Sequence, residues 1–557
     1  MEEFSILIGG KAGFGIDKAS STIAGILNQL SYRIYLYRDY PSLIRGGHTF
    51  SIVRASPQKI AAHKNKIDFL LALNQDTLTF HKNRLKETSI TIYDSDTVKA
   101  DDLPGGVKRA AVAIGKIIKE ENASEIMRNT CMIGSFCKAA GIGWAILEKV
   151  LKKEITKEID LNLKVARRGF NETSESLKVP PIKQDKLPVL NGSETLSLGL
   201  IAAGLKSYIA YPMTPSSNIL HFMANVAKDF GLIVMHPESE IGVIMMALGA
   251  SYAGKKTAVG TSGGGFCLMT EGLSFAGMSE LPIVIILGQR PGPSTGLPTY
   301  SSQTEMNFAI NAGQGEFTRL VAAPSDAEDA YFWGGVSLNL AWKYQIPAII
   351  LMDKTIAEGA YSFDRAAAGE VKEETFPAWD RKDRYKRYLV TETGVSPLAF
   401  VPGKDAIIKI NSYEHDESGI TTEDPAITKQ MQEKRLRKEK FLIQELERYK
   451  SVGIYGKTDS DQAILCWGSN KGVSIEVAEK MGLKVITLSV LCPFPVNQFK
   501  KAVEGVKKMI LVENSATGQL ANLINRYGFK VDSNVLKYDG RPFTVDELEE
   551  ELGRIIK

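Results

Sequence analysis

Cysteine is scarce in this sequence, with five in 557 residues, and the number is odd. Cys131 and Cys137 are the closest pair, and their spacing matches neither a C-x-x-C redox motif nor a cluster-binding run. These few, scattered cysteines do not suit a disulfide framework and are typical of a reducing compartment, so we expect a cytoplasmic protein. They also indicate that any iron–sulfur cluster lies mainly on another chain.

Long apolar runs and an excess of charge are missing as well. The longest apolar runs, such as residues 281–287 and 346–352, are far shorter than a membrane span. The formal net charge is +4, which favours neither nucleic acid nor a membrane surface as a partner. The first residues run from a strand directly into glycines, which a secretory signal does not do.

The alternation of apolar and polar segments predicts an α/β protein with several open, mostly parallel sheets covered by helices on both faces. We expect the following division of the chain: an α/β domain at 1–175, a proline- and lysine-rich linker at 176–191, a second α/β domain at 192–367, an irregular connecting segment with one charged helix at 368–460, and a C-terminal α/β domain at 461–557. The basic run of the charged helix, KRLRK at 434–438, is interpreted as a solvent-exposed face.

The first domain contains two segments whose function stays open. The glycines of GGKAGFG (9–15) resemble a dinucleotide-binding turn, but their spacing differs from G-x-G-x-x-G, and Asp39 is only a partial match to the ribose-binding acid. This turn either binds an anion at a helix N-terminus or serves close packing alone. The loop RGGH (45–48) either faces a substrate or is an ordinary surface loop.

Two segments of the second domain place polar groups at predicted strand ends. Tyr211–Ser217 (YPMTPSS) follows a strand and opens a helix, and its prolines leave the Thr214 hydroxyl and helix N–H groups free for a carboxylate. A plain capped turn would contain the same residue types. Arg290 lies just past a buried strand in a glycine- and proline-rich loop, where it is well placed to bind a carboxylate.

An acidic pair precedes an apolar helix in the same domain. Glu238 and Glu240 stand before IGVIMMALGASYAG, and a glutamate in the first turn of a buried helix can simply complement the helix dipole. From the residues alone, this helix-dipole role is the favoured interpretation.

The run Gly260–Gly264 (GTSGG) matches the nucleophile elbow G-x-S-x-G of serine hydrolases. A hydrolase using Ser262 would need a histidine downstream, and His415, in an irregular polar stretch, is the only one left. The letters around it (414–417, EHDE) also suggest hard-metal ligands, but one such run in a loop is a weak signal. A serine hydrolase therefore remains a minor alternative.

Taken in order, YPMTPSS, the ESE helix start, GTSGGG and GQRPGPSTG resemble the α subunit of 2-oxoacid:ferredoxin oxidoreductases. The resemblance continues through YKRYLVTETGVSP, KRLRK, CPFPV, LVENSATGQL and KYDGRPFT, and it covers residues 192–557. Residues 1–175, with GGKAGFGI and DYPSLIRGGH, resemble the separate γ subunit of this family. The resemblance implies a γ domain fused to a thiamine-diphosphate pyrimidine-type domain and a transketolase C-terminal-like domain.

The resemblance also assigns roles to individual residues. Glu240 matches the glutamate that hydrogen-bonds N1′ of the aminopyrimidine and so favours the tautomer that removes the thiazolium C2 proton. Thr214 and Arg290 match positions that hold the 2-oxoacid carboxylate. Four residues would shape the cofactor pocket: Tyr211, Pro212, Ser262 and Gly263.

The implied reaction is oxidative decarboxylation of a 2-oxoacid with coenzyme A, which yields acyl-CoA, CO2 and reduced ferredoxin. The sequence lacks the GDG…N motif for the magnesium diphosphate half of thiamine diphosphate, so the resemblance implies a β subunit that carries Mg²⁺ and a [4Fe–4S] cluster, in an (αβ)2 assembly. The γ-like domain is expected to border the coenzyme A site. The motifs, including Met213 in place of the commoner isoleucine, are compatible with several 2-oxoacids. A non-catalytic binding or scaffolding relative remains an alternative.

Overall fold

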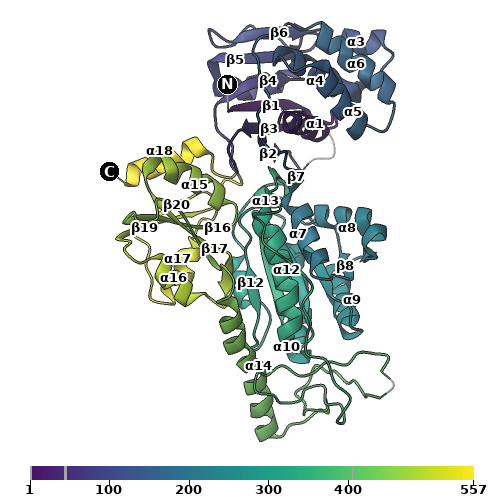
Figure 1. The fold of residues 1–557 in the computed structure, drawn as a ribbon, viewed down its shortest axis with the longest axis vertical. Helices are drawn as coiled ribbons and strands as arrows, with labels where there is room; N and C mark the ends of the chain where they lie inside the picture. Colours follow the sequence, from purple (N-terminus) through teal and green to yellow (C-terminus); the bar gives the residue numbers. More distant parts are fainter. Residues whose placement is uncertain (1–2, 43–46, 404, 557) are drawn as a thin grey trace. The chain divides into compact units, whose positions relative to one another are not determined.

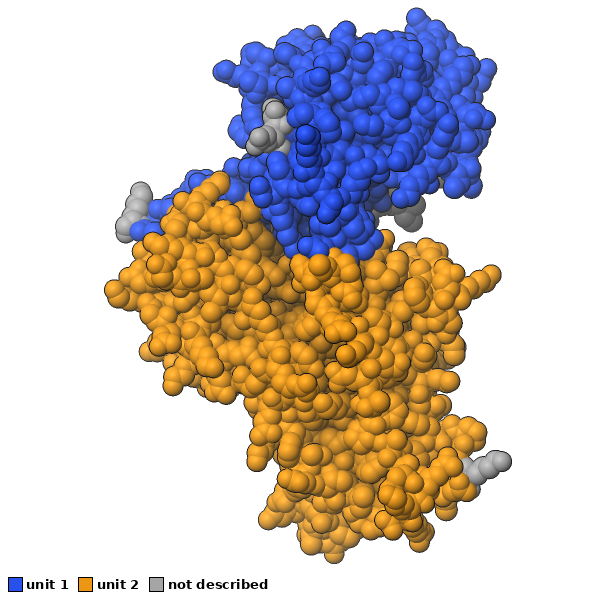
Figure 2. Space-filling model, in the orientation of Figure 1, with its two compact units in different colours: residues 1–190, 359–364, 543–557 blue, residues 191–358, 365–542 orange. Residues whose placement is uncertain are grey.

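The computed structural model describes residues 3–42, 47–403 and 405–556. The chain forms two compact units, coloured separately in Figure 2. Unit 1 consists of residues 1–190, 359–364 and 543–557, and unit 2 of residues 191–358 and 365–542. Within the described ranges, no helix combines the length and the apolar character that a membrane-spanning helix requires.

Unit 1 is built on an eight-stranded sheet with the order β6-β5-β4-β1-β3-β2-β14-β7 (Figure 1). Its strands are β1 (Phe4–Lys11), β2 (Arg33–Asp39), β3 (His48–Ser56), β4 (Ile67–Ala72), β5 (Leu85–Asp94), β6 (Lys108–Val112), β7 (Val189–Asn191) and β14 (Ala360–Ser362). Its helices are α1 (Ile16–Gln29), α2 (Gln75–His81), η1 (Lys82–Arg84), α3 (Ile114–Glu120), η2 (Glu125–Met127), α4 (Arg128–Ala139), α5 (Trp144–Glu154), α6 (Ile159–Asn171) and α18 (Val545–Ile555). The sheet is mixed, because β1 pairs in parallel with β4 and antiparallel with β3.

Two distant parts of the chain complete unit 1. The short strand β14 pairs antiparallel with β2, and the backbone N–H of Ile34 donates to the Ser362 hydroxyl at 2.9 Å. Near the C-terminus, the N–H of Val545 donates to the His63 carbonyl at 3.1 Å. The segment 176–190 also belongs to this unit, and Ile182 N–H bonds the Leu30 carbonyl at 2.9 Å.

Unit 2 contains a seven-stranded sheet with the order β18-β12-β13-β11-β10-β8-β9. Its strands are β8 (Ser207–Ala210), β9 (Ile233–Met235), β10 (Thr257–Ser262), β11 (Ile283–Gln289), β12 (Leu320–Ala322), β13 (Pro347–Asp353) and β18 (Val490–Cys492). The helices of this part are α7 (Gly192–Ala202), α8 (Ser217–Phe230), α9 (Glu240–Tyr252), α10 (Gly263–Ser279), α11 (Met306–Asn311), α12 (Ala327–Tyr344) and α13 (Lys354–Glu358). All neighbours from β12 to β9 run parallel.

Unit 2 also contains a five-stranded sheet with the order β15-β17-β16-β19-β20 (Figure 1). Its strands are β15 (Val452–Gly456), β16 (Gln462–Trp467), β17 (Lys484–Leu488), β19 (Lys508–Glu513) and β20 (Ser533–Leu536), and the helices are α14 (Pro425–Leu446), α15 (Asn470–Met481), α16 (Val496–Ala502) and α17 (Gln519–Asn525). One apolar core joins the two sheets of unit 2, because Ile285 of β11 and Leu465 of β16 belong to the same buried cluster. The predicted α/β class with open sheets is confirmed.

The interpretation of the basic run in α14 is wrong. Lys434 and Lys438 are buried, and their ammonium groups contact the carboxylate of Glu280 at 2.7 and 2.5 Å. Arg435 is buried as well and donates two hydrogen bonds to Glu414, at 2.9 and 2.6 Å. Burying such cations requires carboxylate partners, and these partners lie too far away in the sequence to be visible from the charge run itself.

Candidate functional site

The carboxyl ends of three parallel strands bring the predicted site segments to one edge of the seven-stranded sheet. Ala210 of β8 pairs with Gly260 of β10, and Ser262 of β10 pairs with Gly288 of β11. The turns that follow these strands therefore begin side by side. Open parallel sheets bind their ligands at this edge, where turns and helix N-termini supply polar groups.

Thr214 and Arg290 meet at this edge. Nη1 of Arg290 donates a hydrogen bond to the backbone carbonyl of Thr214 at 2.8 Å, which joins the turn after β8 to the turn after β11. Pro215 lies against Gly288, where an added Cβ would come within 3.0 Å of the proline ring. Burial lowers the pKa of the Arg290 guanidinium, and the nearby carboxyl of Glu305 opposes that shift.

Glu240 is the first residue of α9 and is buried, with 5% of its surface exposed. Its Oε1 atom has no hydrogen-bond partner among the described residues. Glu238, by contrast, is exposed. A buried, incompletely satisfied carboxylate is costly for a folded chain and calls for a further partner.

The first turn of α10 consists of three glycines, each with a different neighbour. An added Cβ on Gly263 would lie 3.1 Å from Oε1 of Glu305, and one on Gly264 would lie 3.7 Å from the Ser294 hydroxyl. On Gly265 it would come within 2.1 Å of the Thr261 hydroxyl and 2.6 Å of Oε1 of Glu240. The glycines thus let two carboxyl groups approach one helix N-terminus, which favours negative charge.

The other residues predicted to shape a pocket lie in the same turns. Tyr211 is 36% exposed, and Pro212 beside it is half-buried. Ser262, the N-cap of α10, is fully buried, and its hydroxyl has no hydrogen-bond partner among the described residues. The turn sequences therefore place Tyr211, Pro212, Ser262 and Gly263 at the sheet edge that also holds Thr214 and Arg290.

Sequence reasoning missed Glu305. This residue is 8% exposed, and burial raises the pKa of its carboxyl to about 7. Its Oε1 accepts a hydrogen bond from the Thr304 hydroxyl at 3.1 Å, whereas Oε2 has no partner among the described residues. The one available signal was an acidic residue directly before an apolar stretch, and it was overlooked because Glu305 ends a loop without periodicity.

The geometry does not support the hydrolase alternative. The Ser262 hydroxyl donates to no histidine in the described ranges. His415 instead contacts the Tyr413 carbonyl at 2.8 Å, and its ring lies tilted against that of Tyr388. The acidic residues around His415 also have protein partners, because the carboxylate of Glu417 forms an ion pair with Lys386 at 2.6 Å. Within the described ranges, no three His, Cys, Asp or Glu side chains converge as metal ligands.

In unit 1, the contacts of the glycine turn favour close packing. An added Cβ on Gly9 would come within 2.7 Å of Thr77, and one on Gly15 within 2.5 Å of the Asn129 amide. Residues 43–46 lie outside the described residues, so the Arg45–Gly46 part of the loop prediction is not assessed. His48, at its end, contacts His81 with 2.9 Å between their Nε2 atoms.

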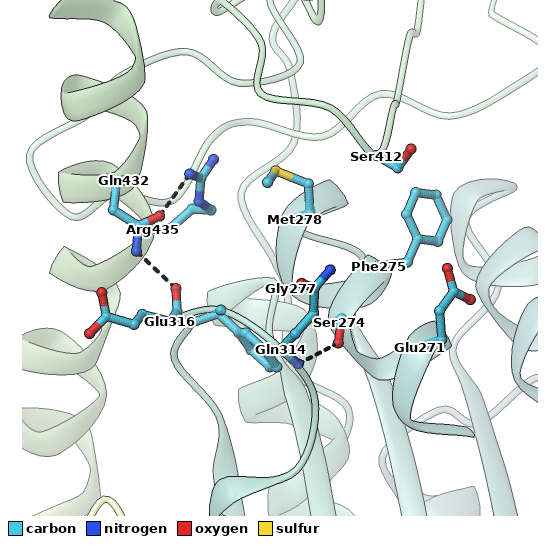
Figure 3. A pocket seen from close by; sticks show the side chains of 12 residues that line it. Glu271, Ser274, Phe275, Gly277, Met278, Gln314, Glu316, Ser412, Gln432 and Arg435 are labelled. Carbon is cyan, nitrogen blue, oxygen red and sulfur yellow. Dashed lines mark hydrogen bonds between the residues drawn. The ribbon is translucent and has the colours of Figure 1, made fainter. Parts of the chain in front are cut away.

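A surface pocket of about 230 Å³ lies further along α10, between that helix and α14 (Figure 3). Glu271, Ser274 and Met278 line it from α10, and Gln432 and Arg435 line it from α14. Its polar groups bond one another, as the Gln432 amide does to the Glu316 carbonyl at 2.9 Å. It contains none of the residues predicted for the site.

The chain is similar to known proteins in both of its units. The family described as pyruvate flavodoxin/ferredoxin oxidoreductase, thiamine diphosphate-binding, matches residues 198–434, and the family described as pyruvate ferredoxin/flavodoxin oxidoreductase matches residues 5–172. The solved structure of 2-oxoglutarate:ferredoxin oxidoreductase from Magnetococcus marinus, with 2-oxoglutarate, coenzyme A and succinyl-CoA bound, is similar over 100% of both chains, with a TM-score of 0.90 and 28% identity.

Curated relatives extend over both units. The α subunit of 2-oxoacid:ferredoxin oxidoreductase from a Sulfolobus species is 31% identical over 99% of this chain and 97% of its own length. The 2-oxoglutarate synthase subunit KorA of Methanocaldococcus jannaschii is 28% identical and matches 98% of its own length but 65% of this chain. The chain therefore belongs to the family of 2-oxoacid:ferredoxin oxidoreductase α subunits, in the longer form that includes the N-terminal oxidoreductase domain.

Proposed function

We propose that Glu240, Thr214 and Arg290 form this chain's half of the active site of a thiamine diphosphate-dependent 2-oxoacid:ferredoxin oxidoreductase of the EC 1.2.7 type. The observation that carries the proposal is the buried carboxylate of Glu240, whose Oε1 has no partner among the described residues. A ring nitrogen of the cofactor is a suitable partner for that atom. The glycines at the start of α10 place no side chain of their own beside it, and a Cβ added to Gly265 would stand 2.6 Å from this Oε1 atom.

Thiamine diphosphate, when bound, supplies the carbon nucleophile and the electron sink that decarboxylation of a 2-oxoacid requires. Glu240 would hold a proton at the aminopyrimidine ring and set its tautomer. Arg290 would bind the substrate carboxylate together with the Thr214 hydroxyl, because a guanidinium recognises a carboxylate with directed hydrogen bonds. Tyr211, Pro212, Ser262 and Gly263 would line the cofactor pocket.

The proposed partner is a β subunit that carries the Mg²⁺–diphosphate site and a [4Fe–4S] cluster, in an (αβ)2 assembly. Support comes from an apolar surface on and beside α9, next to Glu240. Large apolar side chains there are 42–55% exposed: Ile233, Met235, Ile241, Met245, Met246 and Leu268. Such a surface on a folded chain marks a protein interface.

We extend the proposal to the other reactants by analogy. The similar Magnetococcus structure holds coenzyme A and succinyl-CoA, so coenzyme A is the proposed acyl acceptor and ferredoxin the proposed electron acceptor. A cytoplasmic location is proposed from the five cysteines, none of which forms a disulfide. Rates on pyruvate, 2-oxoglutarate, branched-chain and aryl 2-oxoacids would rank the substrates.

The decisive experiment exchanges the two neighbouring glutamates in the chain co-expressed with its β subunit. Glu240→Gln should lower 2-oxoacid- and coenzyme A-dependent dye reduction by about 100-fold or more, as loss of a general acid–base group does. The exposed Glu238→Gln is the matched control and should retain activity. Full activity of Glu240→Gln, or a loss confined to Glu238→Gln, contradicts the assignment.

A separate experiment tests whether the β subunit binds the apolar surface on and beside α9. Met245→Glu should abolish co-purification of the β subunit, because it places a charge in the apolar face. Ile407→Glu, at a loop residue that is 83% exposed, should leave the complex intact. A stable complex with Met245→Glu would contradict docking on α9, and sedimentation of the wild-type complex tests the (αβ)2 stoichiometry.

A further inference from the structure

The loop that precedes α11 holds Glu305 rigidly at the sheet edge. The Gln303 side chain donates to the Trp467 carbonyl at 2.7 Å and accepts from the Asn514 N–H at 2.9 Å. The Gln519 amide donates to the Thr304 carbonyl at 2.7 Å. These three bonds fasten the loop to the five-stranded part of unit 2, so the position of Glu305 does not depend on its own side chain.

A structural role does not account for the Glu305 carboxyl. The residue stands at the N-cap position of α11 but makes no side-chain capping bond. Oε1 accepts a hydrogen bond from the Thr304 hydroxyl of its own loop, and Oε2 is buried with no partner among the described residues. Leaving such an atom unsatisfied is costly for the folded chain, and a purely structural site would pair this oxygen or replace the residue with an apolar one.

A charged neighbour of Glu305 is Arg290. Each side chain shifts the pKa of the other through charge: Glu305 raises that of Arg290 against the effect of burial, and Arg290 lowers that of Glu305 against the effect of burial. The first turn of α10 contributes Gly263 at this point, with no ionisable group. Gln289 and Gln519, from β11 and α17, are neutral, and Glu240 lies against Gly265.

We infer that Glu305 is a positioning residue that acts through Arg290 and takes up a proton when the 2-oxoacid carboxylate binds. The inference rests on the proposed role of Arg290 as the substrate carboxylate clamp. When Glu305 is protonated, the guanidinium has no competing anion and is available to the substrate. When Glu305 is ionised, its carboxylate attracts the guanidinium and repels the incoming carboxylate, so binding draws a proton from solvent.

The pKa of about 7 places this exchange in the neutral range. Because burial raises the pKa, the protonated form predominates below neutral pH and substrate binding is strongest there. Above neutral pH each bound substrate must bring one proton with it. The KM for the 2-oxoacid should then rise by up to about tenfold per pH unit, the slope that linkage sets for one proton.

The test measures kcat and KM for the 2-oxoacid from pH 6 to 8.5 in the complete complex with thiamine diphosphate. In the wild type KM should rise above pH 7, whereas in Glu305→Gln it should stay low and flat, with kcat changed by less than threefold. Glu316→Gln, at an exposed carboxylate of the same unit, is the matched control and should keep the wild-type profile. A Glu305→Gln profile that keeps the wild-type slope overturns the inference.

A second measurement does not require turnover. Infrared difference spectra of the full chain between pH 6 and 8.5 should show one protonated carboxyl band that Glu305→Gln lacks and Glu316→Gln retains. Absence of that difference overturns the inference even if Glu305→Gln fails to assemble with the partner. Failure of the proposed function looks different, because wild-type complex would then show no 2-oxoacid-dependent reduction at any pH.

Discussion

Buried glutamates lie at both ends of α10, but their partners differ between the two ends. At its C-terminal end Glu280 is 1% exposed and is contacted by the ammonium groups of Lys434 and Lys438 at 2.7 and 2.5 Å. Although burial alone would raise it, these cations hold the pKa of Glu280 well below its usual range. At the N-terminal end, Glu240 and Glu305 each keep one carboxyl oxygen without a partner among the described residues.

This difference in partners distinguishes a glutamate that stabilises the fold from glutamates that are available to bind a ligand. The cations at the C-terminal end also match the helix dipole, and the Arg387 guanidinium donates to the Glu280 carbonyl at 2.7 Å. At the N-terminal end the dipole itself favours negative charge, and the guanidinium of Arg290, which lowers the pKa of Glu305, donates its hydrogen bond to the Thr214 carbonyl at 2.8 Å. The same residue type is therefore satisfied by the fold at one end and left reactive at the other.

The largest expected effect is a loss of stability when the carboxylate of Glu280 is removed from the C-terminal end of α10. Glu280→Gln leaves two buried ammonium groups without a carboxylate and should lower the free energy of unfolding by about 3–5 kcal/mol. The midpoint of urea unfolding, followed by circular dichroism, measures this loss. Glu316→Gln on the surface should stay within about 0.5 kcal/mol of the wild type. A loss below about 1 kcal/mol for Glu280→Gln would remove the distinction between the two ends.

The next effect concerns pH and Glu305. Its folded pKa of about 7 exceeds the ordinary value of 4.5, so the unfolded chain releases this proton first and stability falls as pH rises between those values. The stability of Glu305→Gln relative to wild type should therefore increase by about 3 kcal/mol from pH 4.5 to 8, since each pKa unit corresponds to about 1.4 kcal/mol. Paired melting curves across this range measure it. A constant difference would show that Glu305 is ionised throughout.

A smaller effect tests the glycine turn. Gly265→Ala should lower the free energy of unfolding by about 1–3 kcal/mol, because its Cβ collides with Thr261 and with Glu240. Gly264→Ala, whose Cβ meets Ser294 only at an ordinary 3.7 Å, should be neutral in the chain without its partner. Thermal melts of both variants give the comparison, and equal losses would mean that the close approach of Glu240 has no influence.

The smallest expected effect is on stability at Glu240. Glu240→Gln should change the free energy of unfolding by less than about 1 kcal/mol, since the Oε1 atom that it replaces has no hydrogen-bond partner in the described part of the chain. Set against Glu280→Gln, this pair contrasts an activity defect with a stability defect. If Glu240→Gln lowered the free energy of unfolding as much as Glu280→Gln, both glutamates would have a structural role.

The sequence predicted which turns lie together at one edge of the seven-stranded sheet. Thr214 and Arg290 follow buried parallel strands and Ser262 ends one, and the carboxyl ends of such strands meet at one edge. Glu305 was beyond reach, because its position depends on Gln303 and Gln519 bonding to distant segments. The pairing of Lys434 with Glu280 was invisible for the same reason, since 154 residues separate them. Local periodicity contains no information on such contacts.

The return of the chain to unit 1 has a practical consequence for dissection of the enzyme. Because β14 and the C-terminal α18 belong to the first unit, cleavage of the chain at a single position cannot release that unit intact. A protease that nicks the chain near residue 190 should leave two fragments that co-elute under native conditions and part only in denaturant. An independently expressed N-terminal fragment would expose the edge of β2 that β14 pairs with, and it would need an edge-blocking substitution to stay monomeric.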